Sequence, residues 1–223
     1  MSKIISIEGN IGSGKSTILN LLKKYFVNND NIIFLQEPVE EWEKIKDANN
    51  VTILTKFYEN QEKYSFAFQM MAYISRLSLL KKTVEDHPTS IIITERCLNT
   101  DRYVFAKMLY DNGKLEDVEY QIYLNWFDHF LSVFSKYEQN NQKIIYLKTS
   151  PEICFYRVNK RNRNGESNIS IEYLQNCHLY HNEMINTVEN TTQILTINAD
   201  EDTENNQGII NDWILMIQQF IVN

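Results

Sequence analysis

The residues best suited to chemistry lie near the start of the chain, in the glycine-rich run Gly9-Asn10-Ile11-Gly12-Ser13-Gly14-Lys15-Ser16-Thr17. A loop that wraps its backbone N–H groups around a phosphate needs glycine where the chain comes closest and where φ must be positive. Gly9 and Gly14 meet that need, and Gly12 adds freedom. Lys15 supplies a cation for the β- and γ-phosphates of a nucleotide, and Ser16 supplies a hydroxyl ligand for Mg²⁺. The spacing therefore predicts a phosphate-binding loop.

The segments on either side of this run decide between a phosphate-binding loop and an ordinary glycine-rich turn. Residues 3–8 are typical of a short apolar strand, and an apolar-periodic helix follows Ser16. Strand, loop, Lys-Ser pair and helix thus occur in the order that the phosphate-binding motif requires. This context favours nucleotide binding.

Two later strand ends carry carboxylates at the edge where the ligands of a parallel sheet gather. Pro38 ends the second strand and leaves Glu37 at its edge, which makes Glu37 a candidate general base. The third strand ends at Glu95-Arg96, where the carboxylate is suited to hold Mg²⁺ and the guanidinium to clamp a phosphate. The alternatives are a solvated turn glutamate at Glu37 and a surface ion pair between Glu95 and Arg96.

Further charged residues fall on expected helices. Arg76 lies among apolar neighbours and needs a carboxylate partner, for which Asp101 is the candidate. A second group of basic residues crowds into one short stretch, namely Arg157, Lys160, Arg161 and Arg163. Such a group is usually a solvated helix face, but in an acidic chain it also suits an arginine-rich lid, at about residues 157–168, that neutralises phosphate charge during transfer.

The elements that must position these residues alternate along the chain. Five apolar, β-rich segments are separated by helical patterns, at residues 3–8, 32–36, 90–95, 143–148 and 193–197. This alternation predicts a parallel sheet covered on both faces. We therefore expect one α/β domain over residues 1–223, a P-loop NTPase-type three-layer fold in which helices flank a five-stranded parallel sheet.

Two long helical patterns, at residues 62–82 and 117–137, are too apolar to bury only one face. One interpretation is that both helices lie deep in the core. The other is that each also faces a second copy of the chain, which predicts a homodimer built through these two helices.

The overall composition limits the classes of partner. The net charge is −7, which argues against a general affinity for nucleic acid or for an anionic membrane. Cys97, Cys154 and Cys177 are odd in number and have no paired spacing, which is typical of reduced thiols rather than of a disulfide framework. The functional strand follows Met-Ser-Lys directly, and no apolar run approaches membrane-spanning length, so we expect a cytoplasmic protein.

Together these motifs resemble the deoxynucleoside kinase family, especially its deoxycytidine, deoxyguanosine and deoxyadenosine kinase branch. The resemblance covers almost the whole chain. The similar segments, in chain order, are Gly9 to Thr17, Glu37-Pro38-Val39 with Trp42, Tyr58-Glu59-Asn60 to Phe68-Gln69, Glu95-Arg96, Asp101-Arg102-Tyr103 with Phe105, Arg157 to Arg163, and Ile171-Glu172-Tyr173-Leu174. One departure is Cys97, where many members of the family carry serine after the Glu-Arg pair.

The resemblance implies an enzyme that transfers the γ-phosphate of ATP, or of another nucleoside triphosphate, to the 5′-hydroxyl of a deoxynucleoside with Mg²⁺ as cofactor. It implies that Glu37 deprotonates the 5′-hydroxyl while Arg96 and Lys15 assist, and that Ser16 and Glu95 hold the metal. The family's phosphate-binding arginines correspond to Arg157, Arg161 and Arg163.

The resemblance also assigns the residues that bind the deoxynucleoside. It implies that Tyr58 and Glu172 hold the 3′-hydroxyl, that Gln69 pairs with the base edge, and that an apolar slot for the base is formed by Trp42, Phe68 and Phe105. An amide offers a donor and an acceptor side by side, and an aromatic slot stacks on any base. Arg76 and Asp101 resemble the arrangement that selects amino-bearing bases, which predicts deoxycytidine or a deoxypurine as substrate rather than thymidine.

Two other functions compete with this interpretation. A nucleoside monophosphate kinase of the thymidylate kinase type shares the phosphate loop and the basic lid, but a carboxylate such as Glu37 would repel an acceptor that is already phosphorylated. An inactive nucleotide-binding scaffold would leave the joint presence of Lys15, Ser16, Glu37, Glu95 and Arg96 unexplained.

Overall fold

A computed structural model describes residues 2–134, 142–163, 165–201 and 206–222, without the side chains of residues 142 and 207. Its strands are β1 (Lys3–Glu8), β2 (Ile32–Leu35), β3 (Ile91–Glu95), β4 (Gln142–Lys148) and β5 (Gln193–Asn198). Its helices are α1 (Lys15–Tyr25), α2 (Val39–Trp42), α3 (Ile53–Glu59), α4 (Gln61–Asp86), α5 (Leu98–Thr100), the π-helical η1 (Asp101–Ala106), α6 (Lys107–Asp111), α7 (Asp117–Phe134), α8 (Pro151–Arg161), the 3₁₀ turn η2 (Glu166–Asn168), α9 (Ile171–Val188) and α10 (Gln207–Val222).

The five strands form one parallel sheet in the order β2-β3-β1-β4-β5. Ile5 and Ile7 of the central strand β1 are fully buried and pair with Ile93 of β3 and Ile145 of β4. β-Branched residues suit such strands because both faces of the sheet are covered by helices. The predicted sheet is confirmed, and the strand ends differ from the predicted ones by no more than one residue.

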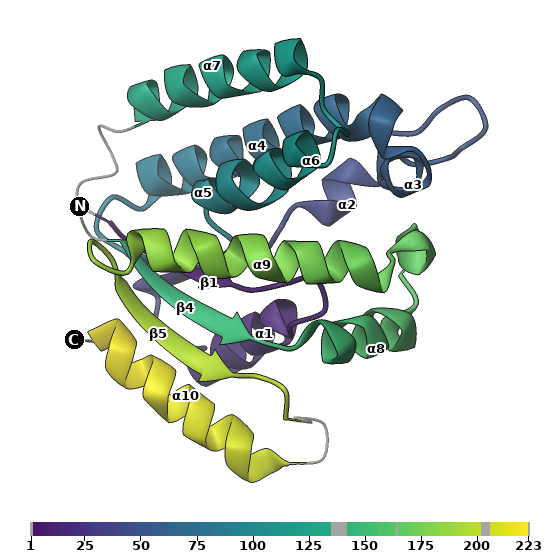
Figure 1. The fold of residues 1–223 in the computed structure, drawn as a ribbon. Helices are drawn as coiled ribbons and strands as arrows, with labels where there is room; N and C mark the ends of the chain where they lie inside the picture. Colours follow the sequence, from purple (N-terminus) through teal and green to yellow (C-terminus); the bar gives the residue numbers. More distant parts are fainter. Residues whose placement is uncertain (1, 135–141, 164, 202–205, 223) are drawn as a thin grey trace.

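Helices cover both faces of the sheet (Figure 1). On one face, α1 and α10 pack on β1, β3, β4 and β5 through Leu22, Trp213 and Ile217. On the other face, α4 packs on β1, β2 and β3, while α9 packs on β4 through Met184 and Ile185. The result is the three-layer α/β arrangement that the alternation of elements predicts.

The structure explains why α4 is apolar on more than one side. α4 lies between the sheet and α7 (Figure 1), and its Tyr73 is fully buried where the ring stacks on Phe127 of α7 with centroids 4.6 Å apart. The two helices predicted at residues 62–82 and 117–137 are therefore both present, although residues 135–137 lie outside the described part of the chain. α4 belongs to the core, whereas α7 still exposes apolar side chains on its outer side.

The topology gathers several functional segments at one edge of the sheet. Because all strands are parallel, the loop after β1, the turn after β2 and the Glu95-Arg96 pair at the end of β3 meet at the carboxyl edge. Within the described residues, no helix has both the length and the apolar character needed to cross a bilayer.

Candidate active site

The glycine-rich loop has the backbone shape that the sequence predicts, with φ of +144° at Gly9, +82° at Gly12 and +97° at Gly14. A Cβ at Gly9 would lie 2.6 Å from the carbonyl oxygen of Leu147, and one at Gly12 would lie 2.5 Å from that of Cys154. Gly12 is thus required sterically, which corrects the expectation that it only adds freedom. A Cβ at Gly14 would meet nothing, so this part of the loop faces open space.

The loop is fixed from both of its sides. The Asn10 side-chain amide donates a hydrogen bond to the backbone carbonyl of Leu174 in α9 over 2.8 Å. The Lys15 ammonium donates one to the backbone carbonyl of Asn10 over 2.7 Å. Ser13 Oγ is buried and has no hydrogen-bond partner in the described part of the chain. An unpaired buried hydroxyl and a loop of backbone donors fit the oxygens of a phosphate group.

The charge on Lys15 depends on what fills this loop. Burial lowers the pKa of the Lys15 ammonium to about 7, and the Arg96 guanidinium adds to that effect, while the carboxylates of Glu95 and Glu37 oppose it. A bound polyphosphate would stabilise the charged form instead, because an opposite charge close by favours ionisation.

The two predicted metal ligands lie side by side. Ser16 Oγ donates to Glu95 Oε1 over 2.8 Å, which places a hydroxyl and a carboxylate at the first turn of α1. The described residues contain no group of three or more histidine, cysteine, aspartate or glutamate side chains that could enclose a metal ion. Two protein oxygens nevertheless fit Mg²⁺, which usually keeps several waters and binds substrate phosphates.

A buried network of two arginines and two carboxylates lies next to this pair. Arg76 Nη2 donates to Glu37 Oε1 over 2.8 Å, and its Nε donates to Asp101 Oδ2 over 2.9 Å. Arg96 Nε lies 3.6 Å from the same Glu37 oxygen. Burial alone raises the pKa of the Glu37 carboxyl, but Arg76 and Arg96 outweigh it and hold the pKa well below its usual range. Glu37 is therefore an ionised acceptor inside the cavity.

Arg96 occupies a strained backbone position that another carboxylate supports. Its φ is +65°, in the left-handed region that residues other than glycine rarely adopt. The buried Glu8 carboxylate accepts hydrogen bonds from the Cys97 backbone N–H over 2.7 Å and from Thr100 Oγ1 over 2.6 Å, and so fixes the turn that follows Arg96. Burial raises the pKa of the Cys97 thiol, so Cys97 acts as a packed neutral group. Sequence reasoning missed Glu8.

The predicted base slot is present and contains one aromatic residue that the prediction missed. The Trp42 and Phe68 rings meet edge to face with centroids 5.6 Å apart, and Phe57 stacks on Phe68 at 4.5 Å. Gln69 is buried at the wall of the cavity, and its amide makes no hydrogen bond within the described residues. Phe105 completes the slot. Phe57 directly precedes Tyr58, but an apolar residue type alone does not distinguish a side chain of the slot from one of the hydrophobic core.

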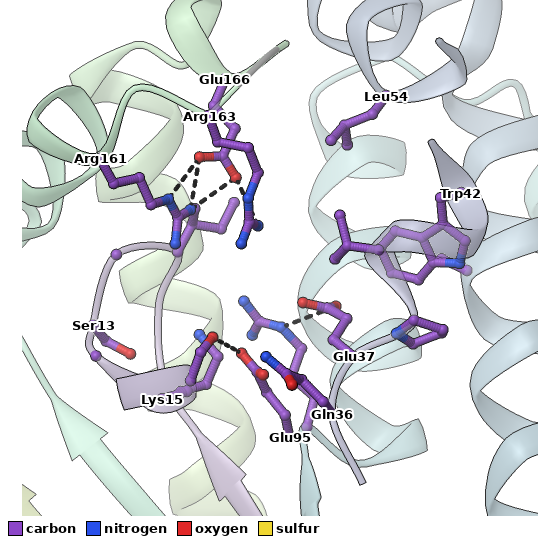
Figure 2. Close-up of a pocket in the computed structure, with 18 of the residues that line it drawn as sticks. Ser13, Lys15, Gln36, Glu37, Trp42, Leu54, Glu95, Arg161, Arg163 and Glu166 are labelled. Carbon is purple, nitrogen blue, oxygen red and sulfur yellow. Dashed lines mark hydrogen bonds and ion pairs between the residues drawn. The ribbon is translucent and has the colours of Figure 1, made fainter. Parts of the chain in front are cut away.

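One cavity of about 980 Å³ connects the phosphate loop, the Ser16–Glu95 pair, Glu37 with its two arginines, and the aromatic slot. In Figure 2, Trp42, Leu54 and Glu37 form one wall, and Arg161, Arg163 and Glu166 form the wall opposite. Lys15 and Glu95 lie at the base between the two walls. The volume is at the upper end of the range for ligand sites and has room for two ligands that meet at Lys15 and Glu37.

The arginines predicted to form a lid are held in two different ways. Arg161 makes a two-pronged ion pair with Glu166, through Nε and Nη2 at 2.8 Å each, and Arg163 Nη1 lies 3.4 Å from the same carboxylate. Arg157 instead donates to the backbone carbonyls of Ala199 and Glu201, over 2.9 and 2.8 Å. All three line the cavity, while residue 164 of the predicted lid lies outside the described part of the chain.

The structure does not bring Glu172 to the cavity. Glu172 is exposed on the first turn of α9 and is not part of the cavity lining. Glu166 lies there instead, with 5% of its surface exposed, on the same cavity as Tyr58. Burial raises the pKa of the Tyr58 hydroxyl and the negative charge of Glu166 adds to the rise, which indicates that the two side chains are close. The only sign of Glu166 in the sequence was that it is a single glutamate shortly after the basic segment that ends at Arg163.

Comparison with known proteins shows which family the chain that forms this cavity belongs to. The sequence profile described as deoxynucleoside kinase matches residues 5–222 of the chain. The chain belongs to the deoxynucleoside kinase family. This kinase is 33% identical to human deoxycytidine kinase over 224 residues, which cover 90% of the chain and 85% of the relative. It is 36% identical to a probable deoxycytidine kinase of fowlpox virus (strain NVSL) over 203 residues, covering 90% of the chain and 80% of the relative.

A third relative of the kinase is named for a different deoxynucleoside. It is the mitochondrial deoxyguanosine kinase of Xenopus laevis, 30% identical over 241 residues that cover 98% of the chain and 89% of the relative. Family membership confirms the predicted activity class, phosphorylation of a deoxynucleoside, and favours it over the monophosphate kinase and the inactive scaffold.

Because the pKa of Lys15 is lowered, we expect nucleotide binding by the kinase to depend on pH. At pH 8, above its pKa of about 7, Lys15 is mostly neutral in the free protein and charged beside the phosphates, so binding of Mg²⁺-ATP takes up a large part of one proton. At pH 6 Lys15 is already charged, and the uptake falls. Titration calorimetry in buffers of different ionisation enthalpy measures this proton count. Equal uptake at both pH values contradicts the assignment.

Proposed function

We propose that this kinase transfers the γ-phosphoryl group of ATP, or of another nucleoside triphosphate, to the 5′-hydroxyl of a deoxynucleoside whose base carries an exocyclic amine. The observation that carries the proposal is that one cavity joins a phosphate loop to the ionised Glu37, with an aromatic slot beyond it. A neutral hydroxyl can donate its proton to such a carboxylate, whereas a phosphorylated acceptor would be repelled by it.

In the proposed mechanism, Glu37 accepts a hydrogen bond from the 5′-hydroxyl, orients its oxygen towards the γ-phosphorus and takes up its proton as the new O–P bond forms and the bond from the γ-phosphorus to the nucleoside diphosphate breaks. Phosphoryl transfer passes through a loose transition state, so the protein contributes mainly position and charge. Lys15 and Arg96 neutralise the oxygens of the transferred group, and Arg161 and Arg163, which pair with Glu166 on the opposite wall of the cavity, add positive charge. Mg²⁺, which Ser16 and Glu95 would hold, would neutralise further phosphate charge.

For the sugar we propose Tyr58 and Glu166 in place of the predicted pair Tyr58 and Glu172. Glu166 is buried at the cavity and electrostatically close to the Tyr58 hydroxyl, while Glu172 is exposed to solvent. A carboxylate accepts the 3′-hydroxyl proton and a phenol can donate or accept, so together they bind a hydroxyl in one orientation.

Removal of the proposed base tests the mechanism. Glu37→Gln keeps the shape and one acceptor for Arg76 but removes the proton acceptor, and we expect kcat to fall by about 10²- to 10⁴-fold while KM for the deoxynucleoside changes only a few-fold. Steady-state kinetics measure both. The control is Glu41→Gln, which changes an exposed carboxylate of α2, the short helix that follows Glu37. Near-normal turnover of the Glu37→Gln protein would exclude Glu37 as the base.

The proposed base preference rests on Asp101 and Arg76. Both Asp101 oxygens accept from Arg76, over 2.9 and 3.3 Å, at the buried end of the slot that Gln69 lines. Burial raises the pKa of Asp101, and the Arg76 guanidinium opposes the rise. A carboxylate can accept from an exocyclic amine, as on cytosine or adenine, but faces a carbonyl on thymine. Two hydrogen-bond acceptors that face each other without a donor weaken binding by about 1 to 3 kcal/mol.

We therefore expect deoxycytidine or a deoxypurine to have a higher kcat/KM than thymidine. The double change Arg76→Met with Asp101→Ala should raise the ratio of kcat/KM for thymidine to that for deoxycytidine by about tenfold or more. The ratio is the correct measurement because loss of the Arg76–Glu37 hydrogen bond lowers turnover of both substrates. Preference of the unchanged protein for thymidine, or an unchanged ratio in the double variant, would overturn the assignment.

We also propose that the kinase is a homodimer in a reducing compartment such as the cytoplasm. The three cysteines are buried and free, which suits such a compartment. The outer side of α7 exposes large apolar residues, namely Val118, Ile122, Trp126 and Val133, and Ile74 of α4 is 40% exposed. A continuous apolar side of this kind supports contact with a second copy.

Light scattering tests the dimer. At low micromolar concentration we expect twice the chain mass of 26.4 kDa. Trp126→Glu places a charge on the α7 surface and should shift the mass to that of the monomer, because an unpaired charge in an apolar contact is costly. The control Leu215→Glu alters an exposed leucine of α10, on the other face of the sheet, and should leave the dimer intact. A monomeric unchanged protein contradicts the proposal.

A further inference from the structure

His181 of α9 is a buried titratable residue that the mechanism above does not use. None of its surface is exposed. Its Nδ1 lies 2.7 Å from the Cys177 carbonyl oxygen, which can only accept, so Nδ1 carries the hydrogen. The other ring nitrogen, Nε2, then presents a lone pair. It lies 3.3 Å from Arg96 Nη1, which can only donate.

Two hydrogen bonds hold one end of the Arg96 guanidinium. Nη1 donates one hydrogen to the Gly9 carbonyl over 2.9 Å and the other to His181 Nε2. The planar group also lies over the Phe105 ring, with its central carbon 4.8 Å from the ring centroid. With Nη1 anchored, Nε faces Glu37 Oε1 at 3.6 Å, and this Nε has no hydrogen-bond partner in the described part of the chain.

We propose that His181 is a positioning residue for phosphoryl transfer: its neutral imidazole accepts a hydrogen bond from Arg96 and so holds the guanidinium towards Glu37 and the transferred group. The inference rests on the role of Arg96 in the proposed function. His181 does not touch the substrates in this mechanism. It acts through the orientation of Arg96.

The surroundings of His181 require the neutral form. Burial lowers the pKa of the imidazole well below its usual value, and the nearby positive charges of Arg96 and Lys15, together with His178, act in the same direction. The Cys177 carbonyl opposes them. Protonation of Nε2 would also set a donor against the Arg96 donor.

A neutral acceptor has an advantage over a carboxylate at this place. A carboxylate would bind Arg96 more strongly, but its negative charge would cancel the positive charge that the phosphoryl oxygens need. Imidazole directs the guanidinium and leaves its charge available. The residue type therefore fits a positioning role beside a site where negative charge develops.

A matched set of substitutions separates this role from simple packing. In His181→Gln the side-chain oxygen can occupy the place of Nε2 and accept from Arg96, whereas His181→Asn keeps only the part that meets the Cys177 carbonyl, and His181→Leu keeps neither. We expect the Gln variant to retain kcat within about threefold. The Asn and Leu variants should lose about 10- to 100-fold in kcat, with KM for both substrates within a few-fold. If all three lose kcat in proportion to their fall in Tm, His181 is only structural.

Combination with Arg96→Lys tests whether His181 acts through Arg96. In that background His181→Leu should cause no further loss of kcat, because the oriented guanidinium is already gone. Independent, multiplying losses would overturn the inference. An Arg96→Lys protein with normal kcat would instead refute the proposed role of Arg96, so the two failures are distinguishable.

The unchanged protein offers a test that needs no variant. The ¹⁵N shifts of the His181 ring at pH 7.5 should report a hydrogen on Nδ1 and an unprotonated, hydrogen-bonded Nε2. An imidazolium, or a ring protonated at Nε2, would overturn the inference even if the substitutions impair folding.

Discussion

The buried guanidinium of Arg76 is the interaction on which the architecture of this site depends. It donates to Glu37 after β2, to the Glu95 carbonyl at the end of β3 and to Asp101 at the start of η1. A buried charge without partners is very costly, and removal of one partner of a buried ion pair costs about 3 to 5 kcal/mol. The segments that carry Glu37, Glu95 and Asp101, which we propose as general base, metal ligand and selector of the nucleobase, are therefore held at fixed distances from α4.

The same site also carries an excess of positive charge at its other end. Burial disfavours the charged form of Lys15, and the nearby Arg96 guanidinium adds to that effect. The carboxylate of Glu37 is affected in the opposite sense, since two guanidiniums keep it ionised. The free protein thus has the ionised carboxylate of Glu37 on one side of the cavity and, on the other, a loop lysine whose charged form a bound polyphosphate would stabilise.

Much of this could be predicted from the sequence, because the signals were local. The phosphate loop depends on neighbouring residues from Gly9 to Thr17, and the sheet on isoleucine-rich runs, so both were found with nearly correct bounds. The sequence placed Glu172 at the cavity, but the structure does not. The reason is that a single glutamate in a helical segment gives no indication of whether it faces the cavity. Glu8 and His181 had no signal at all. Arg96, which His181 contacts, and Cys97 and Thr100, which donate to Glu8, lie 85 or more residues away in the chain, and only the sheet and α9 bring these pairs together.

In the proposed function, the choice of nucleobase and catalysis share one residue. Arg76 holds Asp101 at the end of the slot and Glu37 at the reaction centre with the same guanidinium. A change that alters the slot at Arg76 therefore also releases the base, and its effect on specificity comes together with a loss of rate. Gln69 lines the slot and makes no hydrogen bond to Glu37 or Arg96 in the described residues, so we expect changes there to act mainly on binding, whereas Phe105 also lies against the Arg96 guanidinium. In the proposed function, Gln69 is therefore a position where specificity can change with little effect on the groups around Glu37, whereas changes at Arg76 or Phe105 also reach those groups.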